Sequence, residues 1–460
     1  MGLGFPPLLA AALEVVRAIR ARGHLAVVAG GAVRDHVLGR ALTDADIATD
    51  IPIEELAAMF TVHEVGRSKQ FETVVVARGG HAFEVSRFRR GAAGPPAAIG
   101  SGPPPPAFDP LREDTAHRDF TINALLMDHD GRVIDFQGGL EDLRNRIVRA
   151  VGAPGERFAE DPVRLLRAVR FAAVLGFGIE EATAAAVAGG AWRLTGVAGE
   201  RIGAEILKLS SAPGSALAHG IELMDRFGLL RTVLPEIADL QGLEHPADKH
   251  PEGGVYEHTL AALRASVSPD PAVNLAVLLH DIGKRPAHTV EDGRHRYRGH
   301  EDCGTVFADA IARRLFLPQR IREDLLFAVG HHGECNRLAE LRRSKRLALV
   351  GSGHWPVLRA LALCDLAARG DRDAVARFET LLREVERDAA TCDVCDRPAG
   401  GVISGDRIMA LTGLGPGPRV GAIRRRVTEW ALDNRVEEPA RIEAEVLREA
   451  GISPEGGNGT

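Results

Sequence analysis

An apolar run near the start of the chain predicts a buried strand that leads into a helix. Residues 25–29 read Leu-Ala-Val-Val-Ala and are followed by the pair Gly30 and Gly31. A short apolar run is typical of a strand inside a sheet, and a Gly-Gly pair marks the turn that ends it. We therefore expect a strand, a tight turn and a helix that begins near Ala32.

Two further apolar runs predict a β-hairpin. Residues 73–77 and 82–86 are rich in Val, Ala and Phe and are separated by a second Gly-Gly pair. This arrangement is expected for antiparallel strands joined by a short turn. Residues 91–110 then consist largely of Gly, Ala and Pro, with four consecutive prolines. Proline supplies no N–H to a sheet, so this segment is expected to be a loop or linker.

The remainder of the chain has the apolar spacing of helices. The helical pattern starts at about residue 156, with apolar positions recurring three and four residues apart. Residues 157–175 predict one continuous helix, which Gly176 and Gly178 end. Helices are expected to continue to about residue 390, with a short helical tail after them.

The composition describes a globular chain of several domains. Its 460 residues are too many for one ordinary core, so two to four domains are expected. Hydrophobic residues make up 45% and charged residues 26%, and no apolar run approaches the roughly 20 residues of a membrane span. The first residues lack a secretory signal, and five cysteines are too few for a disulfide framework. We expect a cytoplasmic protein.

The charge does not exclude RNA binding. The net charge is −6, but phosphate contacts need only a local basic face. Arginines form three clusters, and each cluster taken alone predicts a solvated helix face. The clusters are Arg144, Arg146 and Arg149; Arg164, Arg167 and Arg170; and Arg424, Arg425 and Arg426.

Two aspartates after the first strand predict a metal site. Asp44 and Asp46 are two residues apart, so on a strand both side chains face the same side. Paired carboxylates there can share divalent cations that hold the phosphates of a nucleotide and activate an attacking hydroxyl group. Glu84, on a later strand, is a candidate third carboxylate. The Gly-Gly turn brings backbone N–H groups near a triphosphate, with Arg34 close by.

These residues belong to five motifs that resemble, in order, those of class II CCA-adding enzymes and bacterial poly(A) polymerases. The motifs are residues 30–46 (Gly-Gly-Ala-Val-Arg-Asp to Thr-Asp-Ala-Asp), 118–125, 135–152, 160–168 and 200–208. The resemblance implies an α+β protein: a nucleotidyltransferase head with a mixed sheet like that of polymerase β, then an all-α neck, body and tail. The implied domains are residues 1–145, 146–215, 216–390 and 391–460.

The resemblance also implies roles for individual residues. Asp44, Asp46 and Glu84 would be catalytic, the two aspartates holding Mg²⁺. The implied nucleotide-binding residues are Gly30, Gly31, Arg34, Arg118, Asp119, Asn123, Asp161, Arg164 and Arg167.

Asp161 and Arg164 suit the selection of C and A on chemical grounds as well. Three residues apart, they would share one helix face. A carboxylate accepts from an exocyclic amine, and a guanidinium donates to a ring nitrogen. Cytosine and adenine present this amine beside an acceptor, whereas guanine and uracil present the opposite arrangement. The ordinary alternative is a surface ion pair.

Histidines and aspartates in the helical part predict a second metal site. Imidazole together with carboxylate suits a transition metal or Mg²⁺. The pattern resembles the HD phosphohydrolase superfamily, whose minimal set matches four residues and whose two-metal members imply three more. The four are His258, His280, Asp281 and Asp365, and the three are His300, His331 and His332.

This second site predicts hydrolysis of phosphate esters. One or two divalent ions, such as Mg²⁺, Mn²⁺ or Ni²⁺, would bridge a hydroxide and a phosphate, and Lys284 would meet the phosphate. Trimming of 2′,3′-cyclic phosphates from RNA ends is one such task. The alternative is a relic domain kept for packing and tRNA docking.

The sequence therefore predicts an enzyme that adds C and A to the 3′ end of tRNA from CTP and ATP. We expect tRNA, ATP and CTP as partners, and neither a membrane nor DNA. The Pro-rich segment between Glu84 and Arg118 departs from the family's loop, which leaves a CC-only or A-only enzyme open. A poly(A) polymerase is a further alternative. From another class, the rival is a metal-dependent phosphohydrolase with an RNA-binding head.

Overall fold

The computed structural model describes most of the chain. The described residues are 5–64, 73–88, 109–244, 253–291, 294–392 and 402–452. The Pro-rich loop predicted at 91–110 lies almost wholly outside them, as does Cys395. The described residues form two compact units, one made of Met1–Glu205 and His219–Val233, the other of Ile206–Ala218 and Leu234–Thr460.

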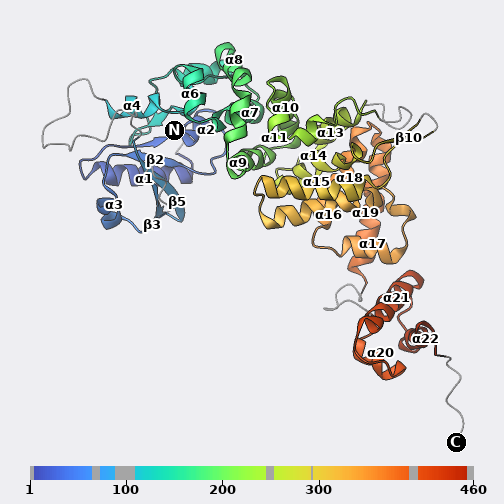
Figure 1. Cartoon of the computed structure of the whole chain (residues 1–460). Helices are drawn as coiled ribbons and strands as arrows, with labels where there is room; N and C mark the ends of the chain where they lie inside the picture. Colours follow the sequence, from blue (N-terminus) through green and yellow to red (C-terminus); the bar gives the residue numbers. More distant parts are fainter. Residues whose placement is uncertain are drawn as a thin grey trace, which may run out of the picture. The chain divides into compact units, whose positions relative to one another are not determined.

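A seven-stranded mixed sheet forms the framework of the first unit (Figure 1). Its order is β3-β4-β5-β2-β1-β6-β7, and neighbouring strands are antiparallel except for the parallel pair of β2 and β5. The strands are β1 (Ala26–Ala29), β2 (Asp46–Thr49), β3 (Val62–Glu64), β4 (Thr73–Arg78), β5 (His81–Arg87), β6 (Leu126–Met127) and β7 (Val133–Ile134).

Helix α1 (Pro7–Arg20) packs against this sheet through a regular apolar stripe. Leu9, Leu13 and Val16 recur at intervals of three or four residues and are fully buried, as expected for one face of an amphipathic helix. The predicted strand at residues 25–29 is confirmed as β1, and the predicted hairpin as β4 and β5, which pair in antiparallel register.

The remaining elements of the first unit surround the sheet and build the helical segment after it. The helices are α2 (Gly31–Val37), α3 (Ile53–Met59), α4 (Pro110–Ala116), α5 (Gly139–Asn145), α6 (Pro154–Glu160), α7 (Val163–Leu175), α8 (Glu181–Gly190), α9 (Gly199–Ser210), α10 (Gly214–Arg226) and α11 (Leu230–Val233), with short 3-10 helices η1 (Thr121–Asn123) and η2 (Ala191–Gly196) and a two-stranded sheet of β8 (Ile147–Val148) and β9 (Gly178–Ile179). Helices α9 and α10 each contribute residues to both units.

The prediction of one continuous helix over residues 157–175 is wrong. The chain forms α6 and α7 with a break at Asp161 and Pro162, because a residue before proline is disfavoured in helical backbone. Asp161 is extended, with φ −146° and ψ 98°. The predicted stop is confirmed: Gly176 adopts the left-handed conformation, with φ 67°, at the end of α7.

The second unit is almost entirely helical. Its helices are α12 (Pro235–Ala238), α13 (Val255–Ala265), α14 (Pro271–Leu279), α15 (His300–Arg314), α16 (Gln319–Cys335), α17 (Arg343–Val350), α18 (Trp355–Ala368), α19 (Arg372–Ala390), α20 (Gly405–Thr412), α21 (Pro418–Asn434) and α22 (Pro439–Ala450), with η3 (Ile282–Lys284), η4 (Leu338–Glu340) and a hairpin of β10 (Thr289–Glu291) and β11 (Arg294–Arg296). No single described helix is long and apolar enough to cross a membrane; only the pair α17 and α18, bent by 108°, passes by length and composition.

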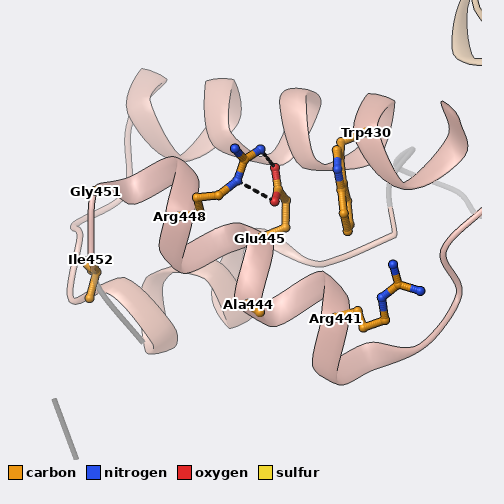
Figure 2. Close-up of a pocket in the computed structure, with 7 residues that line it drawn as sticks. All are labelled: Trp430, Arg441, Ala444, Glu445, Arg448, Gly451 and Ile452. Atoms are coloured by element: carbon orange, nitrogen blue, oxygen red, sulfur yellow. Dashed lines mark hydrogen bonds and ion pairs between the residues drawn. The ribbon is translucent and has the colours of Figure 1, made fainter. Parts of the chain in front are cut away.

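Helices α20, α21 and α22 share a small apolar core that includes Ile408, Ile423 and Val446. Beside this core lies a pocket of about 610 Å³, in which Trp430 of α21 faces the side chains of α22 (Figure 2). Glu445 and Arg448 form an ion pair across its floor. The pocket is separate from the clusters described below.

Asn274 joins distant segments of the second unit. Its side chain is fully buried, and its amide nitrogen lies 2.8–2.9 Å from the backbone oxygens of Ser210, Ala212 and Ser268. Its amide oxygen accepts from the hydroxyl of Ser266 at 2.7 Å. One amide therefore ties the end of α9 to the loop between α13 and α14.

Replacing Asn274 with alanine is expected to destabilise this unit by about 3 kcal/mol, because buried carbonyl groups lose their donor. Hydrogen-exchange mass spectrometry of peptides from α13 and α14 measures the effect as faster exchange. The control is Asn434→Ala, which removes an exposed hydrogen bond to Trp430 and is expected to change stability by less than about 0.5 kcal/mol. Equal exchange in both variants would contradict the assigned role of Asn274.

Candidate functional site

The three predicted catalytic carboxylates lie at one end of the sheet. Asp46 opens β2 opposite Ala29, the last residue of β1 before the Gly-Gly turn. The parallel register aligns Ile47 with Val85, which puts Asp46 beside Glu84 on the neighbouring strand. Asp44 precedes the strand but keeps its alternation, because Asp44 and Asp46 are exposed while the residue between them is buried.

These carboxylates fit a hard cation such as Mg²⁺. Oxygen ligands on a solvent-exposed edge suit an ion that keeps water and substrate phosphates in its coordination shell. Among the described residues, Asp44, Asp46 and Glu84 do not form a group with all ligand atoms within 4.8 Å of one another. The protein thus supplies an open group of three carboxylates, called the carboxylate group below, and not a closed metal cage.

Glycine at position 30 permits a close approach between two segments of the site. Gly30 has φ 76°, a conformation that favours glycine. A Cβ atom there would lie 3.0 Å from Nη1 of Arg118. Arg118 pairs with the buried carboxylate of Asp114 at 2.8 Å, so its guanidinium is held directly beside the turn.

Arg34 is positioned from two sides. Its side chain donates to both carboxylate oxygens of Asp35, at 2.9 and 2.7 Å. A third hydrogen bond, of 2.6 Å, runs from Nη1 to the side-chain oxygen of Asn123. The sequence predicted Arg34 and Asn123 as nucleotide-binding residues, and the structure brings them together. Their contact with a nucleotide remains a prediction.

The buried carboxylate of Asp119 forms an ion pair with Arg167, whose side chain is partly exposed. Arg167 donates from Nε to Asp119 at 2.7 Å, while Asn123 and the N–H of Phe120 donate to its other oxygen. Burial alone would raise the pKa of Asp119, but the charge of Arg167 and these hydrogen bonds lower the pKa to about 2. Asp119 is only 6% exposed. In this structure its carboxylate orients Arg167 and Asn123, and direct contact with a nucleotide remains a prediction.

Three guanidinium groups surround the ring of Phe171. Arg34, Arg167 and Arg170 lie 5.1, 5.3 and 4.2 Å from its centre, and Arg170 donates to Glu205 at 2.6 Å. The expectation of a solvated helix face is therefore wrong for this part of the arginine cluster. Sequence reasoning missed Phe171, Arg170 and Glu205. The available signal was spacing, since positions three and four apart share one face of a helix.

Asp161 and Arg164 do not share one helix face, contrary to the prediction. Asp161 lies at the break before Pro162, and Arg164 lies in the first turn of α7. The carboxylate of Asp161 pairs with Arg201 of α9, at 2.8 and 3.0 Å. Arg164 pairs with Glu160 at 3.0 Å and donates to two backbone carbonyl groups. Arg201 is thus a further candidate that sequence reasoning left without a role.

Six of the seven predicted ligands of the second site come together. Asp281 is at the centre: one carboxylate oxygen lies 3.2 Å from His280 and 4.0 Å from His258. Its other oxygen lies 3.6 Å from His300 and 3.8 Å from His332. Two groups with metal-ligand spacing therefore share Asp281.

Asp365 borders this cluster, and His331 lies outside it. The carboxylate of Asp365 is 2.9 Å from His258. The prediction that His331 and His332 both act as ligands is wrong for His331. Its side chain is 40% exposed and pairs with Glu334 at 3.1 Å. Adjacent residues on a helix point about 100° apart, so only one of the two can face the cluster.

Backbone hydrogen bonds orient three of the imidazoles in this cluster. The Nδ1 atoms of His280, His300 and His332 lie 2.7–2.9 Å from backbone carbonyl oxygens three residues earlier. A carbonyl oxygen only accepts, so each Nδ1 donates and a neutral ring leaves its Nε2 as an acceptor. Such an outer hydrogen bond is typical of metal-binding histidines.

The donor set fits a cation. The Nε2 atoms of His300 and His332 face each other at 3.1 Å, and the buried Nε2 of His280 lies 3.2 Å from a carboxylate oxygen of Asp281. Burial and the charge of His280 lower the pKa of His332 to about 4, so this ring is neutral at pH 7. Burial would raise the pKa of Asp281, but His280 and Lys284 hold it well below its usual value. A positive ion would satisfy these lone pairs together.

Gly283 lets the two halves of this cluster approach. A Cβ atom at this position would lie 2.0 Å from the backbone oxygen of His300 and 2.4 Å from the N–H of Gly304. Any side chain would therefore push α15 away from η3. The glycine after His280 and Asp281 fixes the distance between these residues and His300.

Two protein-family profiles match the chain. The Poly A polymerase head domain matches residues 26–149, which include the carboxylate group and the segment around Asp119. A profile described as the probable RNA and SrmB-binding site of polymerase A matches residues 176–241. The family implies dependence on a divalent metal ion.

Similar proteins include several tRNA nucleotidyltransferases. The A-adding tRNA nucleotidyltransferase of Deinococcus radiodurans is 33% identical and covers 75% of this chain and 80% of its own. The CC-adding enzyme of Thermus thermophilus is also 33% identical, covering 88% and 89%. The structure of the Bacillus stearothermophilus CCA-adding enzyme with CTP matches with a TM-score of 0.68, 25% identity and coverage of 97% and 98%. This chain therefore belongs to the tRNA nucleotidyltransferase family with a poly(A) polymerase head domain, and it is a nucleotidyltransferase.

Proposed function

We propose that this enzyme adds C and A to the 3′ end of tRNA, from CTP and ATP. One observation carries the proposal: the carboxylate group, the Gly-Gly turn and the arginines around Phe171 all lie in the head. The first supplies ligands for a cation and the others supply donors for a triphosphate. Relatives named as A-adding, CC-adding and CCA-adding enzymes support tRNA as the substrate.

The reaction needs no nucleophile from the protein. The 3′-hydroxyl oxygen of the tRNA forms a bond with the α-phosphorus of the nucleotide, the bond to the bridging oxygen breaks, and pyrophosphate leaves. Asp44 and Asp46, with Glu84 beside them, would hold Mg²⁺, which when bound lowers the pKa of the attacking hydroxyl and offsets phosphate charge. Arg34 and Arg118 lie beside the Gly-Gly turn, where they would orient the triphosphate.

Base selection is assigned to Asp161 and Arg164. Both line the segment between α6 and α7, and each already has a partner: Arg201 for the carboxylate and Glu160 for the guanidinium. A base that offers an amine beside a ring acceptor can exchange with these partners, because it supplies one donor and one acceptor. Guanine and uracil present the reverse order and would leave both residues unmatched.

The number of nucleotides added can be measured with tRNA transcripts ending at the discriminator base, at C and at CC, each offered CTP alone, ATP alone and both together. With both nucleotides we expect growth of all three to CCA. The double substitution Asp44→Ala with Asp46→Ala is expected to lower incorporation at least about 10³-fold, since metal stabilisation contributes several kcal/mol. Surviving incorporation would refute the assigned site.

Other outcomes of this assay identify the alternatives. Arrest at CC, or growth of the CC-ended transcript alone, would identify a CC-adding or A-adding enzyme. Long A tails on unrelated RNA would identify a poly(A) polymerase.

Replacing Asp161 with alanine is expected to reduce the preference for CTP over UTP about 5- to 150-fold, because a matched pair of base contacts contributes about 1–3 kcal/mol of discrimination. The ratio of kcat/KM for the two nucleotides measures this preference. Glu156→Ala, which removes an exposed carboxylate from helix α6 just before Asp161, is the control. An unchanged ratio in the Asp161 variant would remove this residue from base selection.

We further propose that the second unit hydrolyses phosphate esters at RNA ends. The facing Nε2 atoms of His300 and His332 and the shared carboxylate of Asp281 favour this function. One or two divalent ions, such as Mg²⁺, Mn²⁺ or Ni²⁺, would bind the two groups and when bound generate hydroxide at neutral pH. For a 2′,3′-cyclic phosphate, hydroxide oxygen bonds to phosphorus, one ester bond breaks and the freed ribose oxygen takes a proton. Lys284 would hold the phosphate.

His280→Ala is expected to lower cyclic-phosphate hydrolysis at least about 100-fold, because it removes a ligand from a buried set. Bound metal, measured by elemental analysis of the dialysed protein, is expected to fall in parallel. Nucleotide addition by the same variant reports whether the chain is folded. If the wild-type protein leaves cyclic phosphates untouched with each of the three metals, the hydrolase proposal is wrong.

We place the reaction in the cytoplasm, where a tRNA substrate is available. The four described cysteines are free thiols, which is in keeping with a reducing compartment. We also retain the proposed division into head, neck, body and tail at residues 145, 215 and 390. The relatives that are tRNA nucleotidyltransferases argue against the rival prediction of a stand-alone phosphohydrolase with an RNA-binding head.

A further inference from the structure

A hairpin separates two ligands of the histidine–aspartate cluster in the sequence. Asp281 precedes η3, and His300 begins α15; strands β10 and β11 lie between them. Sequence reasoning did not predict this hairpin. Its second strand and the residues after it read Arg-His-Arg-Tyr-Arg-Gly-His over positions 294–300. Basic and aromatic residues therefore alternate, and alternate positions of a strand face opposite sides.

The aromatic residues of this segment form one continuous stack. The rings of His288 and His295 are 5.0 Å apart and 15° from parallel, with a ring-to-ring hydrogen bond of 2.8 Å. Tyr297 stacks on His288 at 5.4 Å and 29°. All three side chains are half-buried, whereas Arg294 and Arg296 are exposed.

Lys284 connects this stack to the metal-ligand cluster. Its ammonium group lies 5.7 Å from the centre of the Tyr297 ring and donates to Asp281 at 2.6 Å. The backbone oxygen of Tyr297 in turn accepts from Nδ1 of His300. A flat aromatic surface, a cation and the shared carboxylate therefore lie in series.

This series matches the chemistry of a nucleotide with a terminal phosphate. Bases stack on aromatic rings without regard to sequence, and neighbouring cations attract the phosphate backbone. Packing alone would explain buried rings, but it does not account for the exposed arginines beside them, at positions 294 and 296 of β11 and at position 298 after it. Of these, Arg298 pairs with Glu291.

We propose that the stack of His288, His295 and Tyr297 is a platform for the 3′-terminal nucleotide of an RNA strand, whose terminal phosphate is presented to Lys284 and Asp281. The inference rests on the proposed hydrolase function for its biological use. It adds the residues that would recognise the terminal nucleotide of such an RNA end.

The kinetic test compares two substrates of the full-length, metal-loaded protein: a short RNA ending in a 2′,3′-cyclic phosphate, and bis(p-nitrophenyl) phosphate, which lacks a nucleotide. For Tyr297→Ala, the ratio of kcat/KM for RNA to that for the small diester is expected to fall about 5- to 100-fold, chiefly through a higher KM for RNA. Tyr297→Phe, which keeps the ring, is expected to recover most of the ratio.

The control variant is Phe316→Ala. Phe316 is an exposed aromatic residue, 66% accessible, just beyond the far end of α15 from His300. Since a 15-residue helix spans about 22 Å, its loss is expected to leave the ratio unchanged. An equal ratio in the wild type and Tyr297→Ala would overturn the platform.

A second measurement does not depend on hydrolysis. An RNA trinucleotide with 3′-terminal 4-thiouridine 3′-phosphate is cross-linked to the chelator-treated protein by light, and the peptides are mapped by mass spectrometry. Cross-links are expected within residues 285–298 and to weaken in Tyr297→Ala. Cross-links elsewhere only would overturn the platform. If neither substrate is hydrolysed but residues 285–298 are labelled, the hydrolase proposal fails while the platform stands.

Discussion

The ion pair of Asp119 and Arg167 is the interaction on which the head site depends. Removing Arg167 would leave the buried carboxylate of Asp119 without its charged partner, which destabilises the head. Asn123 donates to Asp119 and accepts from Arg34. One chain of polar contacts therefore runs from α7 through Asp119 to α2 and the Gly-Gly turn. The helix that carries Arg164 and the turn beside Asp46 are positioned by the same network.

In the second unit, Asp281 has the corresponding role, because the other candidate metal ligands gather around its carboxylate. Asp281 contacts four imidazoles and Lys284, and each imidazole comes from a different element of the unit. The close contact at Gly283 sets how near α15 can come. Because the three histidines hydrogen-bond to backbone carbonyl groups through Nδ1, the Nε2 atom of a neutral ring is left as an acceptor within the cluster.

The sequence predicted local elements and the residue types of both sites well, but not which side chains meet. The spacing of apolar residues and the turn residues were sufficient to predict β1, the β4–β5 hairpin and the end of α7 at Gly176. The helix breaks at Asp161 because of Pro162. The apolar residues on both sides keep helical spacing, so the pattern predicted one continuous helix. The sequence alone cannot distinguish His331 from His332, because only the orientation of α16 decides which of the two faces the cluster. Arg201 pairs with Asp161 from 40 residues away, and no local pattern carries that information.

The two candidate metal sites differ in how completely the protein alone builds them. Asp44 and Asp46 offer exposed oxygen ligands at the start of the central strand β2, and Mg²⁺ held by one or two carboxylates takes its remaining ligands from water and substrate phosphates. We therefore expect the head to bind its ion together with a nucleotide. In the helical unit the tautomers are fixed beforehand and Asp281 already serves both ligand groups. We therefore expect an ion to bind there before any substrate, because the candidate ligands already lie together in a buried cluster.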